Sequence, residues 1–481
     1  MEEEKKKKKD SDEQGSPRGS TVTQVIMNSA NIIDNADTQL FPNLYNQVQV
    51  DFATNHNVTI TLDQLGWITG IRSLLQAVTT PIWGWWNDRH SRKKVLAFGC
   101  LLWGVFTLLM AVSVNFVELL LFRAVTGVGL AVIIPTTQSV IADYIKPAQR
   151  GKAFGWLGLT QIIGIIAGTI FATVFVESVP ADWRLVFILW GVISLVMAAL
   201  VMLFAKDPVR GATDPELATK GGQPPREEQQ VQLAAFKEIL TNRTFMFIVL
   251  QGIIGSLPWN AVLFMVAWFE YIGFDPVTAG VMFLAMAVGA AIGNLLGGVI
   301  GDYAARKSPK YGRIAMAQLS GAMGIPFACI IFLVIPQTLD SMYIYILFGF
   351  ITTVLNQWPS TACNNPIFSE IFEPEIRGTV FSVDRAFEGS LASLGTVFVA
   401  LIAASLGFIN PTVDIPLLSA AVRQTNANAL DMGMFYMFVI PQAISCALYT
   451  IVYFTYPRDF QKMRAILEAR ALKQVSQEPQ E

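Results

Sequence analysis

Residues 84–96 read GWWNDRHSRKKVL, and residues 298–307 read GVIGDYAARK. Both contain the pattern Gly-x-x-x-Asp-x-x-x-Arg-Lys: Gly84, Asp88, Arg92 and Lys93 in the first, and Gly298, Asp302, Arg306 and Lys307 in the second. Each copy lies at the end of a long apolar run. A charged phrase that recurs in the same setting so far along the chain predicts an internal repeat.

The composition is that of a membrane protein. Apolar residues make up 53% of the 481 residues and charged residues 15%, whereas soluble domains average roughly 45–50% and 25%. A helix needs roughly 20 mostly apolar residues to cross a hydrocarbon core of about 30 Å. Twelve continuous runs of this kind predict an all-α integral membrane protein with twelve transmembrane helices. They are 24–46, 65–86, 95–114, 119–142, 153–176, 185–205, 245–272, 278–300, 314–335, 342–368, 379–406 and 432–456.

Lys and Arg are distributed unevenly between the connecting segments. If the N-terminus is cytoplasmic, 29 of the 34 Lys and Arg lie on the cytoplasmic side, and only Arg184 and Arg423 lie outside. Arg72, Arg123 and Arg385 fall within spans. The asymmetry satisfies the positive-inside rule with both termini in the cytoplasm. We therefore expect a multi-pass protein of the plasma membrane or an internal membrane.

A polar segment rich in Gly, Pro and Glu divides the spans into two sets of six. We expect a disordered cytoplasmic tail at 1–22, a six-helix half at 23–205, a cytoplasmic linker with an amphipathic helix at 206–243, a second half at 244–456 and a cytoplasmic tail at 457–481.

A second phrase is also repeated in the two halves. ADYIKPAQRG at 142–151 and SEIFEPEIRG at 369–378 share an acid, Pro, Arg and Gly. The pairs are Asp143 with Glu370, Pro147 with Pro374, Arg150 with Arg377 and Gly151 with Gly378. Both phrases follow an even number of crossings, so the halves are parallel repeats, which places a substrate site between them near the midplane.

These motifs carry a resemblance to a known family. The loop at 84–96 resembles the cytoplasmic signature loop of the major facilitator superfamily, with Ser91 where a glycine is usual, and LLLFRAVTGVG at 119–129 is similar to its fourth-helix signature. Within that superfamily the chain is most similar to the spinster-like branch. The stretches that carry this similarity are NIIDNAD, FRAVTGVG, SVIADYIKPAQRG, DWR, NNPIFSEI and DRAFEG.

We interpret the repeated loop as a latch between the halves. Gly84 is small enough to let two helices approach, and Asp88 can engage Arg92 and the positive N-terminus of the eleventh helix. The alternative is that these charges only set topology and helix packing. The predicted gating residues of the two phrases are Gly84, Asp88, Arg92, Asp143, Arg150, Gly298, Asp302, Arg306, Glu370 and Arg377.

Charges within the spans mark the candidate site, because an ionised group at bilayer depth must be paired or hydrated. The first span contains Asp34 and Asp37, and Asn28, Asn31 and Asn35 form a polar stripe beside Asp34. Exposing these polar side chains to lipid would be unfavourable, so we expect this face of the helix to line a cavity.

The resemblance assigns roles to two of these charges. Spinster-like transporters have an Asp at the place of Asp34, which implies that it binds and releases a proton, and Arg123 is its expected partner. The Arg that usually follows that Asp is Asn35 here, and the branch's Glu after Gly-x-Gly is Leu130. Facilitated diffusion therefore stays open beside proton coupling.

The other charges have structural and functional alternatives. Arg72 is interpreted as a gate residue paired with a carboxylate of the opposite half, or else as a binder of anionic cargo. Asp384, Arg385 and Glu388 form a gating or structural cluster in which Arg385 and Glu388 can pair. Glu270 lies at a helix end and is expected to be solvated.

Uncharged residues complete the predicted cavity. In this superfamily the first, fourth, seventh and tenth helices line it, and the seventh and tenth spans contain Pro258 and Pro359, which permit bends. The predicted cavity residues are Asn31, Asn35, Trp259, Asn260, Asn356, Gln357 and Trp358.

The leading hypothesis is a secondary transporter of an anionic or amphiphilic metabolite, such as a lysolipid, working by alternating access. The alternatives are a facilitative uniporter of an organic anion or sugar, and a receptor-like member that does not transport. No nucleophile–base pair, metal motif or cofactor motif is present, so we expect neither an enzyme nor a cofactor. We expect a monomer in the lipid bilayer whose partners are a small solute and protons, with no nucleic acid.

Overall fold

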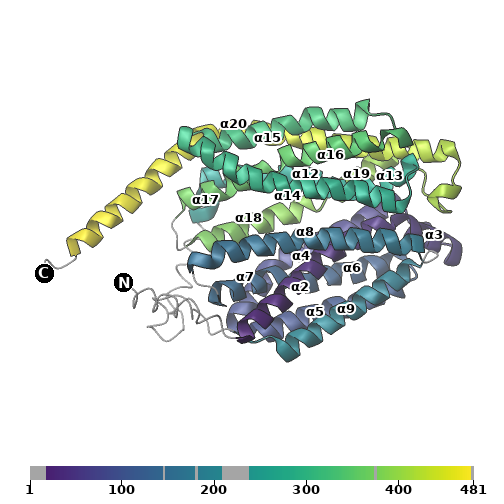
Figure 1. Cartoon of the computed structure of the whole chain (residues 1–481), viewed down its shortest axis with the longest axis horizontal. Coiled ribbons are helices and arrows are strands. Elements are labelled where there is room, and N and C mark those ends of the chain that lie inside the picture. Colours follow the sequence, from purple (N-terminus) through teal and green to yellow (C-terminus); the bar gives the residue numbers. More distant parts are fainter. Residues whose placement is uncertain (1–17, 145–146, 179–181, 208–237, 373–375, 478–481) are drawn as a thin grey trace, which may run out of the picture.

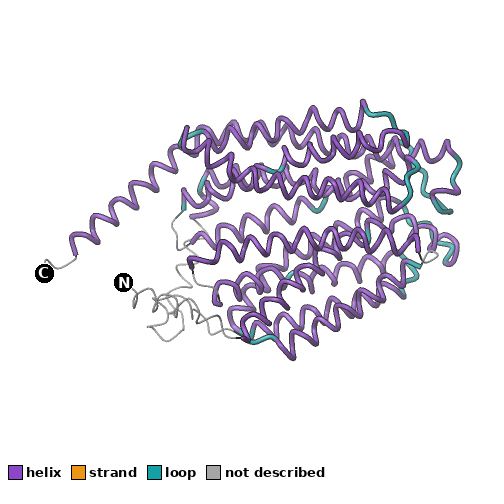
Figure 2. The backbone as a smooth tube through the Cα atoms, in the orientation of Figure 1, coloured by secondary structure: helices purple, strands orange, loops and turns teal. Residues whose placement is uncertain are grey.

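The computed structural model describes residues 18–144, 147–178, 182–207, 238–372 and 376–477, and within these ranges the chain is helical with short loops and without strands (Figure 2). Helix is present in each of the twelve predicted spans. The all-α fold class is thus confirmed.

The first half contains helices α2 to α9. Their bounds are α2 (Arg18–Leu40), the 3₁₀ turn η1 (Pro42–Leu44), α3 (Tyr45–Asn55), α4 (Leu62–Arg89), α5 (Arg92–Ala111), α6 (Phe116–Leu130), α7 (Ile133–Tyr144), α8 (Pro147–Ser178) and α9 (Trp183–Phe204).

The second half contains helices α12 to α20. Their bounds are α12 (Arg243–Ala261), η2 (Val262–Phe264), α13 (Met265–Ile272), α14 (Pro276–Lys307), α15 (Gly312–Cys329), η3 (Ile330–Val334), η4 (Leu339–Ser341), α16 (Met342–Asn356), η5 (Pro359–Asn364), α17 (Asn365–Ile371), α18 (Arg377–Ala392), α19 (Gly395–Ser405), η7 (Ile415–Leu417) and α20 (Ala420–Gln477).

Several spans are built from two helical pieces. The seventh span changes from α-helix to 3₁₀ helix after Ala261, three residues beyond Pro258. The tenth contains a π-helical segment that begins at Pro359. Proline lacks the backbone N–H that an α-helix requires, which explains why these changes of helix type occur near Pro258 and Pro359.

Ten helical segments of the described chain are long and apolar enough to cross a membrane. The predicted spans that fall short are the first and the second. The first contains Asp34 and Asp37, and the second contains Arg72 and Gln76. These helices pack against neighbours, α2 on α8 and α4 on α6, which keeps their polar faces away from lipid.

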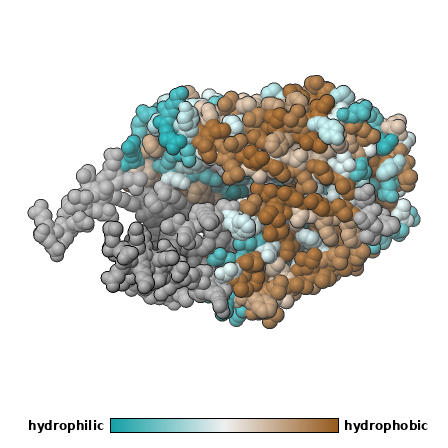
Figure 3. Space-filling view, in the orientation of Figure 1, coloured by the Kyte–Doolittle hydropathy of each residue, from teal (hydrophilic) through white to brown (hydrophobic). Residues whose placement is uncertain are grey.

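The helices run side by side along the long axis of the molecule, with the first half below and the second half above in Figure 1. The start of α2 and the last turns of α20 lie at one end, which we call the termini end; the opposite end, which holds α3, is the far end. Apolar side chains cover the middle of the visible face, and hydrophilic residues gather towards its ends (Figure 3).

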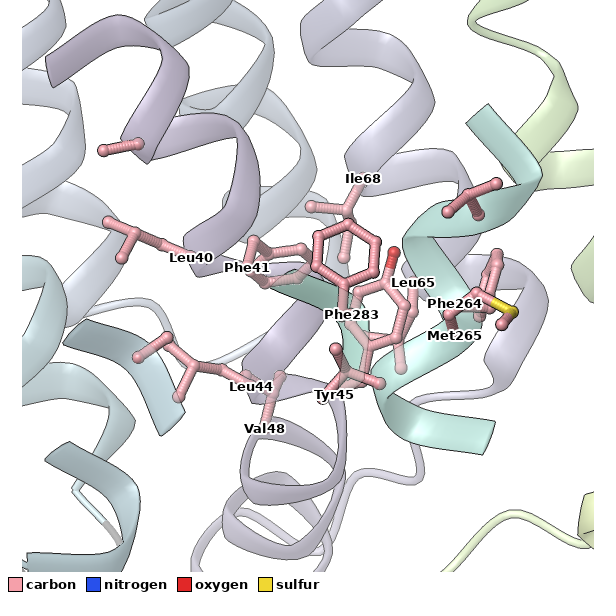
Figure 4. Packing of buried hydrophobic residues seen from close by; sticks show 14 of the residues in the cluster. Leu40, Phe41, Leu44, Tyr45, Val48, Leu65, Ile68, Phe264, Met265 and Phe283 are labelled. Atoms are coloured by element: carbon pink, nitrogen blue, oxygen red, sulfur yellow. The ribbon is translucent and has the colours of Figure 1, made fainter. Parts of the chain in front are cut away.

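Buried apolar residues join the two halves near the far end. Figure 4 shows Phe41 and Tyr45 of the first half beside Phe264 and Phe283 of the second. The ring centroids of Tyr45 and Phe264 are 5.3 Å apart. This aromatic contact closes the space between the halves at that level.

Two predicted segments differ from the structure or lie outside it. The last helix, α20, continues to Gln477, so most of the predicted tail at 457–481 is an extension of the twelfth span (Figure 1). Most of the predicted amphipathic helix in the linker, and the N-terminal tail as far as residue 17, lie outside the described residues.

Candidate functional site

Asp34 and Asp37 on α2 meet the two arginines of the first half. Arg72 of α4 donates from Nε to Asp37 Oδ2 at 3.0 Å and from NH2 to Asp34 Oδ1 at 3.1 Å. Arg123 of α6 donates from NH1 to the same Asp37 oxygen at 2.9 Å and from NH2 to the Asp37 carbonyl at 3.0 Å. All four side chains are buried, and their formal charges cancel.

Gln76 completes this set, which we call the charged network: Asp34, Asp37, Arg72, Gln76 and Arg123. Gln76 accepts from Arg72 NH1 at 3.1 Å and donates to Asp34 Oδ1 at 3.2 Å. It lies one helical turn from Arg72. A second polar residue at that spacing in an apolar span is the signal that would have identified it from the sequence.

Two pairings expected from the sequence are wrong in this conformation. Arg123 pairs with Asp37 rather than with Asp34. Arg72 pairs with both aspartates of its own half, not with a carboxylate of the opposite half. The reason is that α4 and α6 pack against each other, so Arg72 and Arg123 lie close enough together to donate to the same oxygen of Asp37.

A glycine brings the arginine-bearing helices together. A methyl group added at Gly127 of α6 would lie 2.2 Å from the carbonyl oxygen of Arg72 on α4. Only a residue without a side chain permits this approach. On the other side, the Arg123 guanidinium lies 5.7 Å from the centre of the Phe41 ring.

Bonding in the charged network is nearly but not fully satisfied. Asp37 Oδ1 and Arg123 Nε are buried without a hydrogen-bond partner among the described residues. An unpaired polar atom or an unbalanced charge costs free energy in a low-dielectric interior. We therefore expect the network to rearrange only in ways that keep its charges balanced.

The asparagines of the predicted polar stripe on α2 lie in different environments. Asn31 is fully buried and donates to Thr160 Oγ1 of α8 at 2.8 Å, so it joins helices and lines no cavity in this conformation. Asn35 is half-buried and donates to the Asn31 carbonyl at 2.8 Å.

The corresponding part of the second half has a neutral network. Gln251 of α12 donates to Ser445 Oγ of α20 at 2.8 Å, and Asn364 donates to Gln251 Oε1 at 3.3 Å. Tyr449 in turn donates to Asn364 Oδ1 at 2.8 Å. Asn356 accepts from Gln442 of α20 at 3.1 Å, so this predicted cavity residue is buried between helices.

The remaining predicted cavity residues differ in exposure. Trp358 is buried and donates to the Val354 carbonyl at 2.8 Å. Trp259, Asn260 and Gln357 are half-buried. These three, with Asn35, are the predicted cavity residues that retain accessible surface.

The acidic cluster of α18 is not an ion pair. Asp384 is buried and its Oδ1 has no partner among the described residues, and no ion pair joins the exposed Arg385 to Glu388. The i, i+3 pairing predicted for Arg385 and Glu388 is therefore wrong here. Glu388 lies instead against Gly252 of α12.

The two repeated phrases of the second half meet at the termini end. Arg313 of α15 donates to Asp302 at 3.1 Å and to Glu370 at 3.2 Å, and Tyr456 also donates to Glu370. Arg306 lines the same pocket of about 290 Å³. Arg313 lies in neither repeated phrase, so no motif of the sequence pointed to it.

The first copy of the loop is described only in part. Arg92 is buried, and a methyl group at Gly84 or Gly298 would meet no atom within 4 Å. The close helix approach expected at Gly84 is thus absent in this conformation. The side chains of Asp88, Asp143, Arg150 and Arg377 lie outside the described residues.

At the far end, hydrogen bonds join the halves. Asn410, which follows α19, accepts through Oδ1 from the backbone N–H of Leu62 at 2.9 Å and from Gln49 at 3.4 Å. Asn46 donates to Asp414 Oδ1 at 3.4 Å. No sequence pattern pointed to Asn410, because its partners lie in the other half.

Helix packing reinforces this closure, which we call the far-end gate: Asn46, Gln49, Leu62, Gly66, Thr396, Asn410 and Asp414. Thr396 donates to the Gly66 carbonyl at 3.0 Å. A methyl group at Gly66 would lie 2.9 Å from the Thr396 carbonyl oxygen, so α4 and the α18–α19 span are in tight contact.

Glu270 was expected to be solvated, but the structure places it in the interior. Its side chain is buried and Oε1 has no partner among the described residues. The prediction that it is solvated is wrong because α13 packs against α14 and α20.

Comparisons with known proteins agree on one family. A family model described as Major Facilitator Superfamily matches residues 31–396. A 3-(3-hydroxy-phenyl)propionate transporter of Escherichia coli (strain K12) is 28% identical over 246 residues, which is 50% of this chain and 56% of that protein. Protein spinster of Drosophila melanogaster is 24% identical over 394 residues, covering 79% of this chain and 61% of its own length. The chain thus matches little more than half the length of each of these relatives.

A solved structure shows the same fold. It is the crystal structure of a bacterial homologue of the human lysosomal transporter Spinster, in an inward-facing and unoccupied conformation. The TM-score is 0.77 at 19% identity, and the match covers 92% of this chain and 99% of that one.

Proposed function

This chain belongs to the Major Facilitator Superfamily, and from that premise we propose that it is a secondary transporter that moves a small organic solute across a membrane by alternating access. The observation that carries the proposal is the asymmetry between its ends. The halves are joined by hydrogen bonds and an aromatic contact at the far end, whereas at the termini end a methyl group added at Gly84 or Gly298 would meet no atom within 4 Å. This is the arrangement of a carrier open on one side.

The open side is the cytoplasmic side in this proposal. Among the described residues, the termini end carries the basic loops at 89–94 and 306–313, and the positive-inside rule assigns such loops to the cytoplasm. The resemblance to an inward-facing structure supports the same orientation. Transport then requires the far-end gate to separate while the termini ends of the halves approach each other.

The charged network supports coupling to protons. Arg72 is shared between Asp34 and Asp37, so a proton on Asp34 would leave Arg72 with one ionised partner. The freed guanidinium N–H groups would then suit an anionic group of the solute. Because both arginines are otherwise engaged, an anionic solute and a proton would bind together.

The solute class that we propose is an organic anion or an anionic amphiphile. The E. coli relative is named for a phenyl-substituted carboxylate, which supports an anion with an apolar part. A stability screen tests this directly, because a ligand that binds only the folded state raises the melting temperature. Lysolipids, organic anions and sugars are compared in detergent at two pH values. A shift by sugars alone would contradict the anion proposal, and a ligand that binds without counterflow in liposomes would favour a receptor.

Asp34→Asn should remove the pH dependence of transport. The asparagine keeps the shape of the side chain but binds no proton, so we expect counterflow of the solute to continue while proton-driven accumulation is lost. Accumulation is measured in liposomes with an imposed pH gradient. Asp275→Asn, a helix-cap change at the far end, is the matched control. Accumulation by Asp34→Asn equal to that of the unmodified protein would favour facilitated diffusion or another proton carrier.

Asn410→Ala should favour separation of the far end. The change removes the acceptor for Leu62 N–H and Gln49, and a lost hydrogen bond of about 1 kcal/mol corresponds to roughly a fivefold rise in the open population. Spin labels on the exposed residues Thr54 and Thr412 report the distance between the halves. The background protein has Cys329 and Cys446, which are half-buried, replaced by serine.

Asn428→Ala is the control for this change, because Asn428 is exposed at the same end and, within the described part of the chain, accepts from Gln424 of its own helix and not from the other half. Equal distance distributions in the two variants would show that Asn410 does not hold the gate.

A further inference from the structure

A compact cluster fastens α3 to the start of α9 at the far end; we call it the far-end clamp, and it consists of Asp51, His56, Trp183 and Arg184. Arg184 NH2 donates to Asp51 Oδ2 at 2.8 Å and contacts His56 Nε2 at 2.9 Å. Its NH1 donates to the carbonyls of Ala111 at 2.7 Å and Ser113 at 2.9 Å. Trp183 Nε1 also donates to Asp51 Oδ2, at 3.0 Å. Three segments of the first half are therefore tied together by one guanidinium.

The contact with His56 requires a neutral imidazole. Arginine has only N–H donors, so Nε2 of His56 must be the acceptor and Nδ1 must hold the proton. An imidazolium has no acceptor, and it would place a second positive charge 2.9 Å from Arg184 NH2. Protonation of His56 is therefore incompatible with the contact as it stands.

No nearby acid among the described residues is free to pair with the positive charge of a protonated His56. Asp51, the acid nearest to His56 along α3, already accepts from Asn55 at Oδ1 and from Arg184 and Trp183 at Oδ2. Burial alone would raise the pKa of Asp51, but those hydrogen bonds and the Arg184 charge outweigh it and hold the pKa below its usual value. Asp51 thus stays ionised and paired with Arg184 at neutral and mildly acidic pH.

The remaining nearby acids are also engaged elsewhere. Asp182 caps α9 by accepting from the Arg184 backbone N–H at 3.0 Å, and Glu118 of α6 accepts from Val114 N–H at 3.0 Å. Among the described residues, Arg184 is the charged group within hydrogen-bond distance of the His56 ring. An imidazolium could gain an acid only by displacing Arg184 from Asp51.

The same short helix carries part of the far-end gate. Asn46 and Gln49 of α3 contact the 410–414 segment of the second half, and His56 caps the C-terminus of α3. Gln49 and His56 are about two helical turns apart, a rise of roughly 10 Å. Loosening the end of α3 from α9 therefore acts on the segment that holds the two halves together.

We propose that His56 and Arg184 form a pH switch, in which protonation of His56 releases α3 from α9 and favours opening of the far-end gate. The switch responds to the pH of the compartment at the far end. It goes beyond the proposed transport function and rests on it only for the meaning of gate opening, since the structural response is measured without any solute.

The experiment measures the Thr54 to Thr412 spin-label distance in the full chain, in detergent, at pH 7.5 and pH 5.5. We expect the fraction of long distances to rise about tenfold at the lower pH, as for loss of a hydrogen bond to a charged group. In His56→Gln the amide oxygen accepts from Arg184 at both pH values, so the distance should stay short at both. In His56→Phe no acceptor is present, so the long distance should be populated at both.

An unmodified protein whose distances are the same at both pH values would overturn the switch, and so would a His56→Gln variant that responds as the unmodified protein does. A His56→Phe variant that stays closed at both values would overturn it as well. A gate that responds to pH in a protein that shows no counterflow of any solute would uphold the switch and refute the proposed function.

Discussion

Arg123→Met is expected to destabilise the protein by about 3–5 kcal/mol, as for other buried pairs that lose one partner. Arg123 is fully buried and its NH1 contacts Asp37 Oδ2 at 2.9 Å. Without it, Asp34 and Asp37 share the single guanidinium of Arg72, which leaves one negative charge uncompensated inside the helix bundle. Thermal unfolding in detergent measures the loss, and counterflow measures the accompanying loss of transport.

The double variant Arg123→Met, Asp37→Asn is the matched control, because it restores the balance between Asp34 and Arg72. Replacing both members of a buried pair is often close to neutral, so the double variant should be more stable than Arg123→Met alone. With Asp37→Asn included, the three variants form a cycle whose coupling energy we expect to be about 0.5–3 kcal/mol. Equal losses in the single and double variants would mean that packing on Phe41, not charge, explains the role of Arg123.

Gly127→Ala is expected to disrupt the site without changing any charge. The added methyl group would lie 2.2 Å from the Arg72 carbonyl oxygen, so α6 must move away from α4. These two helices carry Arg123 and Arg72, and both guanidinium groups would shift relative to Asp37. Overpacking of this kind destabilises by about 1–3 kcal/mol, and here we expect at least that, with transport reduced further.

Gly158→Ala is the control for this change. Gly158 lies within α8, and a methyl group there would meet no atom within 4 Å. The higher helix propensity of alanine should leave stability unchanged or raise it by up to about 1 kcal/mol. If the two alanine variants unfold at the same temperature and transport equally well, the close contact at Gly127 does not position the arginines.

The candidate site was only partly predictable from the sequence. Asp34, Asp37, Arg72 and Arg123 were identified because a charge within an apolar run must have a partner or water. Their pairing was not predictable, since Arg72 lies 35 residues from Asp37 and Arg123 lies 86 residues from it. The family resemblance favours Asp34 as the partner of Arg123, whereas in the structure both Arg123 hydrogen bonds go to Asp37, from NH1 to Oδ2 and from NH2 to the backbone carbonyl.

The contacts at the two ends of the molecule were also only partly predictable from the sequence. The repeated loops identified Asp302 and Glu370, but Arg313, which joins them, belongs to neither phrase. No sequence motif marks Asn410, because its side-chain oxygen accepts from Leu62 N–H only once the 62 and 410 regions of the chain lie side by side.

The sequence by itself determined the twelve helical segments, their division into two repeated halves and the charged residues within the spans that mark the candidate site. These properties depend on the local run of residues, because transfer into lipid is set by each segment's own apolar length and charge. Only the tertiary structure decided which charges pair, which asparagines join helices rather than face a cavity, and at which end of the helix bundle the two halves are joined. Those outcomes depend on the approach of helices distant in sequence, and at Gly127 and Gly66 a single missing side chain sets how close that approach can be.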